Sequence, residues 1–334
     1  MFSLTKSKKM IHISIKDYAI RLVETNGRDI SLVKFVEERV LPAGIIEQGK
    51  IIDEIAFYEF MKTTVKELRI KNRQVRFNVP DPIVIMRQAE VPSKLKAKEE
   101  IREYLQMEIG KHIHLPFSDP IIDLIDPEQR ETEQIYFFAA PGEELRKYTE
   151  IFADADLKPI AADVGILGDY RYFEHMDQVQ EDRVYLIIEC NVTSVHLGIF
   201  HKHQLEFLRY QDLDLDLIRP EQDWEMQRHA WTYVQDEETV AEVMQDQVNE
   251  LERVMNFYRF SLHKGEKSVT DMVLLGDYPA LHTIYKSMRN RFEGVSVTRL
   301  QERWTPAIGE QIDTVFIPAF GLALRGGKKD ASRS

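Results

Sequence analysis

Residues 184–200 carry the polar side chains with the clearest chemical potential in this chain. Residues 184–188 are an apolar run, which predicts a strand buried on both faces, and residues 193–200 predict a second strand after a tight turn. The polar residues at this expected hairpin tip are Glu189, Asn191, Thr193 and Ser194. Such a tip is suited to a metal ion and a phosphate group. The alternative, which we favour for Glu189, is a structural ion pair with Lys16 or Arg21.

Length and composition restrict the class of protein. With 334 residues the chain suits two domains, and its net charge of −12 argues against a general nucleic-acid binder. Cys190 is the only cysteine, so no internal disulfide is possible and a reducing compartment is expected. No apolar run approaches the length of a membrane-spanning helix. We therefore expect a cytoplasmic protein without direct membrane insertion.

The first part of the chain predicts the element order β-β-β-α-β-β. Residues 10–23 and 30–40 are expected as strands joined at Asn26-Gly27, a frequent hairpin dipeptide. A helix begins at Asp53, and strands follow at 75–79 and 83–91. Pro92 is the expected boundary of an inserted unit, residues 92–155, with the order α-β-β-α. Its charged helix spans 94–109.

The remaining chain predicts a second domain and a return to the first. The second domain spans 184–309, with a long helix at 237–263 and a buried strand at 270–275. The first domain comprises residues 10–91, 156–183 and 310–325. The polar, basic tail 326–334 is expected to be disordered.

Two halves that each open with a hairpin, one of them carrying an insertion, resemble the actin-like plan. Several phrases resemble the PilM family of type IV pilus assembly proteins, which is similar to the division protein FtsA: AIRLVE at 19–24, GIIEQGKIID at 44–53, MEIGKHIHLPF at 107–117 and PAFGLALRG at 318–326. The resemblance implies an α/β, actin-like two-domain fold. Each domain would hold a mixed five-stranded sheet flanked by helices, with the α-β-β-α subdomain inserted in the first.

The nucleotide-binding motifs that the resemblance implies are degenerate. The first hairpin of the family carries Asp, Gly and Lys where this chain has Ser14, Lys16 and Arg21. In the second hairpin Asn191 replaces a glycine, and Gly276 alone survives from the glycine-rich adenosine turn. Glycine lets backbone N–H groups approach phosphate closely, so these losses weaken an ATP site. We expect a pseudo-ATPase with little or no ATP or Mg²⁺ binding, no other metal and no enzymatic activity beyond a weak ATPase. Lys16 would either contact a phosphate or act as a substitute cation.

The resemblance also implies a partner. In the family, a groove between the inserted subdomain and the first domain takes the short cytoplasmic N-terminal tail of the membrane protein PilN. The candidate groove residues are Ile85, Arg87, Ile109, His112, Leu115 and Phe117. The alternative for the apolar ones is the core of the subdomain.

Three functions follow as hypotheses. The first is a scaffold of pilus, competence or secretion assembly, held at the inner face of the cytoplasmic membrane by a PilN-like partner and contacting other assembly components. The second is an ATP-binding switch of the same fold. The third is an FtsA-like filament-forming division protein, which would need a terminal amphipathic helix that residues 326–334 do not supply.

Overall fold

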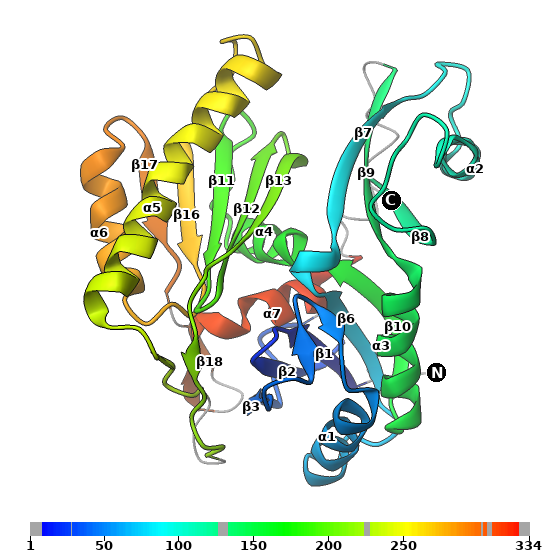
Figure 1. Cartoon of the computed structure of the whole chain (residues 1–334), viewed down its shortest axis with the longest axis vertical. Helices are drawn as coiled ribbons and strands as arrows, with labels where there is room; N and C mark the ends of the chain where they lie inside the picture. The colour runs from blue at the N-terminus through cyan, green and yellow to red at the C-terminus, as the bar shows by residue number, and fades with distance from the viewer. Residues whose placement is uncertain are drawn as a thin grey trace, which may run out of the picture.

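Two five-stranded sheets form the two domains of the computed structural model (Figure 1). The structure describes residues 9–27, 29–125, 133–223, 228–301, 303–305 and 309–326. The strands of the first sheet, in spatial order, are β10 (Lys158–Val164), β6 (Gln74–Val79), β1 (Lys9–Ile15), β2 (Ala19–Asn26) and β3 (Phe35–Val40). The strands of the second are β13 (Gln204–Asp212), β12 (Ser194–His201), β11 (Val184–Cys190), β16 (Asp271–Leu275) and β17 (Ser296–Arg299). Each sheet joins an antiparallel hairpin to parallel strands, so the predicted fold class is confirmed.

The first hairpin differs from the prediction. Residues 10–23, expected as one strand, are the two antiparallel strands β1 and β2, which reverse at Asp17-Tyr18. Backbone hydrogen bonds between Lys16 and Ala19 close this turn. Nearly every residue of both strands is buried, so polar and apolar positions do not alternate and the turn leaves little trace in the sequence. The hairpin predicted at residues 184–200 is confirmed.

Helices cover both sheets and separate them. Helix α1 (Glu54–Glu67) begins as predicted, because the Asp53 carboxylate accepts a hydrogen bond from the backbone N–H of Ala56. Helices α4 (Gly165–His175) and α7 (Ile317–Leu324) lie between the two sheets (Figure 1). In the second domain α5 (Glu237–Asn256) and α6 (Leu281–Arg291) pack beside each other. A π-helical segment, Phe257–Leu262, continues α5 to the end of the predicted helix.

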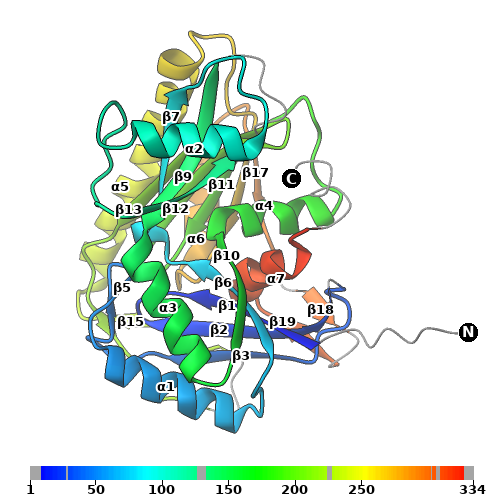
Figure 2. The ribbon, with the colours of Figure 1, turned by 90° about the vertical axis from the view of Figure 1, so that its right-hand side faces the viewer.

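The inserted unit has different boundaries from the predicted residues 92–155. Its sheet has the order β7 (Ile85–Glu90), β9 (Gln134–Pro141) and β8 (Pro120–Ile125), with α2 (Lys98–Glu108) beside it. Strand β7 therefore belongs to the insertion. Helix α3 (Gly142–Asp154) does not, because it packs beside α1 and contributes Tyr148 and Phe152 to the core of the first domain (Figure 2). The unit is β-α-β-β, since pairing with β9 and burial of an apolar helix face outweigh the proline at position 92.

Short elements complete the described chain. They are β4 (Ile46–Glu47), β5 (Lys50–Ile51), β14 (Leu217–Ile218), β15 (Thr232–Tyr233), β18 (Arg303–Thr305), β19 (Glu310–Ile312) and the 3₁₀ turns Asp81–Ile83 and Thr314–Phe316. Within the described ranges, no helix has the length and apolar character needed to cross a bilayer. The tail predicted to be disordered, residues 326–334, lies outside the described residues apart from Gly326.

Candidate functional site

A buried ion cluster joins the two domains where their hairpins meet. Lys16, in the β1–β2 turn, places its Nζ 2.8 Å from Oδ2 of Asp81, which follows β6. The same Nζ lies 2.7 Å from Oε1 of Glu189, at the end of β11. The three side chains are at most 8% exposed. One ammonium group thus holds a carboxylate from each domain.

Two further titratable groups complete this cluster. His196 on β12 lies with Nδ1 3.1 Å from Oδ1 of Asp81. Asp169 on α4 is buried, and neither of its carboxyl oxygens has a hydrogen-bond partner among the described residues.

Protonation in the cluster follows from burial and charge. Burial, followed by repulsion from Glu189, raises the pKa of Asp169 well above its usual range. Burial alone would lower the pKa of Lys16, but Asp81 and Glu189 outweigh it and the pKa is raised. For Asp81, His196 and Lys16 outweigh burial, and the pKa of this carboxyl is lowered. Lys16 is therefore a charged ammonium group, and the Asp81 carboxylate that it contacts is ionised.

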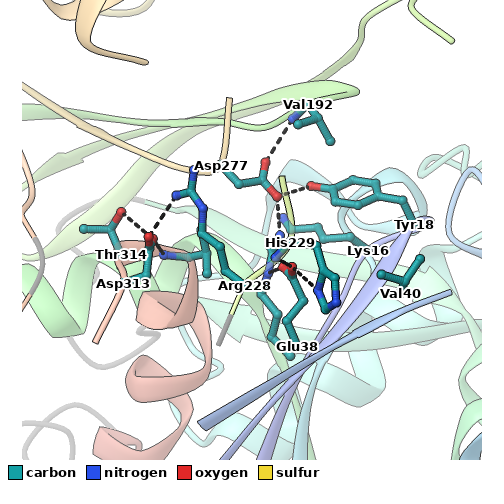
Figure 3. Close-up of polar contacts among 12 residues, drawn as sticks. Lys16, Tyr18, Glu38, Val40, Val192, Arg228, His229, Asp277, Asp313 and Thr314 are labelled. Carbon is teal, nitrogen blue, oxygen red and sulfur yellow. Dashed lines mark hydrogen bonds and ion pairs between the residues drawn. The ribbon is translucent and has the colours of Figure 1, made fainter. Parts of the chain in front are cut away.

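A second buried network lies beside the first and also crosses between the domains (Figure 3). Arg21 on β2 donates from Nε to Oε2 of Glu38 on β3 at 2.7 Å and also pairs with Asp277, which follows β16. Tyr18 donates to Asp277 at 2.8 Å. The other oxygen of Asp277 accepts the backbone N–H of Val192 at 2.9 Å. This N–H, at the tip of the second hairpin, is a donor that could otherwise bind a phosphate oxygen.

Glu38 extends the network to a long second-domain loop. Its Oε1 accepts the backbone N–H of His229 at 2.7 Å (Figure 3). Burial by itself would raise the pKa of Glu38, but Arg21 and His229 lower it to about 2. The carboxylate is therefore ionised under all physiological conditions, and the loop is fixed to the first sheet.

A cavity of about 470 Å³ lies between the inserted unit and the two domains. Its apolar lining includes Ile121 and Ile125 of β8, Phe138 of β9, Leu167 of α4, Phe200 of β12 and Leu205 of β13. Among the described strands, β8 pairs on one side only, with β9, so its other edge has no strand partner. An apolar cavity beside a free strand edge can take an extended peptide.

Comparison with known proteins decides the family. The model of the type IV pilus assembly protein PilM matches residues 12–218, which is more than half of the chain. The chain belongs to the PilM family. No protein of curated function matches the sequence.

Solved structures agree with the fold. A PilM–PilN type IV pilus biogenesis complex superposes with a TM-score of 0.73 and 20% identity, covering 96% of this chain and 99% of that chain. The ethanolamine utilization protein EutJ from Carboxydothermus hydrogenoformans matches with a TM-score of 0.50 and 10% identity, covering 95% and 90%. MreB5 of Spiroplasma citri bound to ADP also gives 0.50 and 10%, covering 98% and 100%. At these identities the likeness shows the actin-like fold alone.

The three charged residues among the predicted nucleotide residues of this PilM-family chain are engaged in ion pairs within the protein. Lys16, Arg21 and Glu189 are all buried in the two ion networks. Ser14 is buried opposite Arg21 in the hairpin register. Asn191 is fully buried, and neither side-chain polar atom has a partner within the described chain.

Thr193 and Ser194, the two hydroxyl residues of the hairpin tip, also contribute to the fold. Thr193 accepts the backbone N–H of Leu213 on its carbonyl, and Ser194 begins β12. The sequence reasoning missed Asp81, Asp169, His196 and Asp277. Asp81 and Asp277 each directly follow the end of a buried strand region, which is the one signal that could have found them.

Gly276 allows the backbone after β16 to pack closely against the end of β11. It has φ +120°, and a Cβ added there would lie 2.0 Å from the carbonyl oxygen of Cys190. Burial raises the pKa of the Cys190 thiol, which keeps it protonated and inert. Beside Gly276 a polar cavity of about 350 Å³ remains, lined by Arg228, Arg299 and the start of α6. Tyr278 lines it too, but its buried ring packs near Tyr233 in the second core.

At this cluster, a divalent cation could find ligands by displacing Lys16. Asp81, Glu189 and His196 offer ligand atoms that all lie within 4.8 Å of one another. The ammonium of Lys16 already contacts an oxygen of each carboxylate, so a second cation there would meet a like charge.

The predicted groove residues lie away from the large cavity, and none of the six lines it. Four of them pack against the core of the inserted unit, as the alternative interpretation expected: Ile85, Ile109, Leu115 and Phe117. Arg87 is exposed and donates to the carbonyl of Met86, and His112 is exposed and pairs with Glu108. These apolar residues form part of the core of the inserted unit, because a small three-stranded sheet is stable only when a helix or further apolar side chains cover one face.

Proposed function

We propose that this PilM-family chain is a scaffold of type IV pilus assembly whose interdomain cleft is closed by its own ion networks, with little or no ATP binding. It binds the short N-terminal tail of a PilN-like membrane protein in the 470 Å³ cavity and reaches the membrane through that partner. The observation that carries the proposal is the Lys16 ammonium between Asp81 and Glu189.

The networks supply what a nucleotide and its metal ion would otherwise supply. Lys16 provides the positive charge between the domains, and Asp277 provides the anion that accepts the Val192 N–H. Because both groups are side chains of the protein itself, they are present in the cleft at a high effective concentration whether or not a nucleotide is bound. Entry of a triphosphate would have to break buried ion pairs, which is costly once one partner loses its counter-charge.

The partner assignment rests on the cavity and on the solved relative. The relative is described as a PilM–PilN complex, and the cavity offers an apolar lining with a free strand edge. A short tail with alternating apolar residues could add to β8 and place those residues against Phe138 and Leu167. Charged side chains at the rim include Arg102 and Asp123, which pair with each other.

Thermal unfolding with and without Mg-ATP tests the nucleotide part. A ligand at 100 times its Kd adds about 2.7 kcal/mol to the free energy of unfolding. We expect no rise in Tm at millimolar Mg-ATP. The polar cavity beside Gly276 supports the second candidate, an ATP-binding switch. A saturable rise in Tm would establish that candidate and contradict the closed scaffold.

Substitution of Ile121 tests the partner part. Ile121 lines the cavity and is 45% exposed, so Ile121→Asp should fold normally yet place a carboxylate against an apolar peptide. We expect the affinity for a synthetic PilN tail, measured by fluorescence anisotropy, to fall about tenfold or more. Ile160→Asp is the matched control, because Ile160 is equally exposed on β10 and does not line the cavity. Equal binding by both variants would exclude this cavity as the groove.

A further inference from the structure

The π-helical segment after α5 presents two phenylalanine rings to solvent. Phe257 is 45% exposed and Phe260 is 58% exposed, while Tyr258 between them is fully buried. Large aromatic rings are seldom exposed on a protein surface. Where two of them lie together beside side chains of one charge sign, they indicate a contact site. Helical turns of the π type are also frequent at functional positions.

The segment is held firmly, so the exposure of its rings is built into the fold. Tyr258 donates to Oε2 of Glu206 on β13 at 2.5 Å, and His263 Nε2 lies 2.9 Å from the same oxygen. Lys267 Nζ lies 3.1 Å from the other oxygen, Oε1. The Phe257 ring leans on Phe207, with 5.8 Å between centroids. Three bonds to one carboxylate fix the segment against the second sheet.

Two basic side chains accompany these rings, although the chain carries a net charge of −12. The Arg259 guanidinium lies 5.0 Å from the centroid of the Phe260 ring. Lys264 follows in the next turn and is exposed. Within the described chain neither Arg259 nor Lys264 forms an ion pair. Glu266 is the one acidic residue between positions 257 and 267.

We propose that this basic aromatic tip, formed by Phe257, Arg259, Phe260 and Lys264, docks on an anionic lipid surface. The rings would enter the headgroup region, and the two cations would meet lipid phosphates. The local positive charge complements an anionic bilayer and opposes pairing with a second copy of the same tip. Two rings standing on a convex helix end also suit a deformable lipid surface better than a rigid protein face.

The tip lies at the same end of the molecule as the inserted unit. Figures 1 and 2 both place the C-terminal end of α5 and the strands β7 and β9 at this end. Docking would therefore turn the inserted unit toward the lipid. Docking of the tip requires neither a protein in the cavity nor a bound nucleotide.

Tryptophan fluorescence at the tip gives a direct test. The probe is the full chain carrying Phe260→Trp, mixed with vesicles of equal parts phosphatidylglycerol and phosphatidylcholine. We expect a blue shift of the emission and quenching by brominated lipid, neither of which occurs with phosphatidylcholine alone. Ile55→Trp is the matched control, because Ile55 is 77% exposed at the start of α1. Its emission should not change.

Flotation with the same vesicles measures the contribution of each part. We expect Phe260→Ser to weaken binding about tenfold. Arg259→Gln with Lys264→Gln should weaken it about twenty-five-fold, because each cation near an anionic surface contributes about fivefold. Raising the salt concentration should release the protein. An unshifted Phe260→Trp spectrum on anionic vesicles would overturn the proposal. So would vesicle binding that the tip variants leave unchanged, since the basic chain ends would then carry it.

Discussion

Replacing Lys16 by alanine is expected to lower the free energy of unfolding by about 3–5 kcal/mol, the usual cost of removing one partner of a buried ion pair. Asp81 and Glu189 would be left as buried carboxylates without their shared counter-charge. Urea denaturation followed by circular dichroism measures the change. The control is Lys62→Ala, which removes an ion pair of similar length to Asp156 on the surface. Solvent screens that pair, so its loss should leave the unfolding free energy nearly unchanged.

The same variant tests whether the ammonium occupies the place of a cation. Without Lys16, the ligand atoms of Asp81, Glu189 and His196 are close enough to bind a divalent ion. Mn²⁺ should therefore restore part of the Tm of Lys16→Ala and leave the Tm of the unaltered protein where it is. If Lys16→Ala is as stable as the parent, or if Mn²⁺ stabilises the parent equally, the ammonium does not hold the domains together.

Replacing Gly276 by alanine should destabilise the second domain by about 4 kcal/mol or more, which is at the upper end for a single substitution. The new Cβ would lie 2.0 Å from the Cys190 carbonyl oxygen, 2.6 Å from its carbon and 2.8 Å from its nitrogen. All three are backbone atoms, so no side chain can move aside. Strands β11 and β16 would have to separate, and φ +120° is strained for any residue with a Cβ.

Gly265→Ala is the control for Gly276→Ala. Gly265 also has a positive φ, +92°, but nothing lies within 4 Å of an added Cβ. Its substitution should cost only the backbone strain of about 1–2 kcal/mol. Urea midpoints of the two variants give the comparison, and equal midpoints would show that the close approach to Cys190 relaxes easily. A loss of ATP affinity with unchanged stability would instead assign Gly276 to a nucleotide site.

Local sequence patterns were sufficient to predict most helices and strands of the fold. The helix after Asp53 and the hairpin at residues 184–200 lie where the sequence predicts them, because a cap residue and an apolar run act over a few positions. The turn at Asp17-Tyr18 was missed for the opposite reason. It joins strands buried on both sides, and burial on both faces removes the alternation that marks a strand boundary.

Packing decided the boundaries of the inserted unit. Helix α3 follows directly after β9 in the chain, yet its apolar residues Tyr148 and Phe152 meet Phe57 of α1. No local signal says which of two nearby cores an amphipathic helix will join. For the same reason the apolar residues predicted for a groove could not be told from core residues, and Leu115 and Phe117 prove to support the subdomain.

The amino-acid pattern alone was enough to predict the fold class, the family and the loss of glycine and carboxylate at the family's phosphate positions. It also singled out Lys16 and Glu189 as candidates for one ion pair. The role of these charges became clear from the folded arrangement, because Asp81, Asp277 and His196 come from distant points of the chain and lie near the ends of different strands. Charge neutralisation in a buried cleft depends on distances between such residues, and a linear pattern carries no information on those distances.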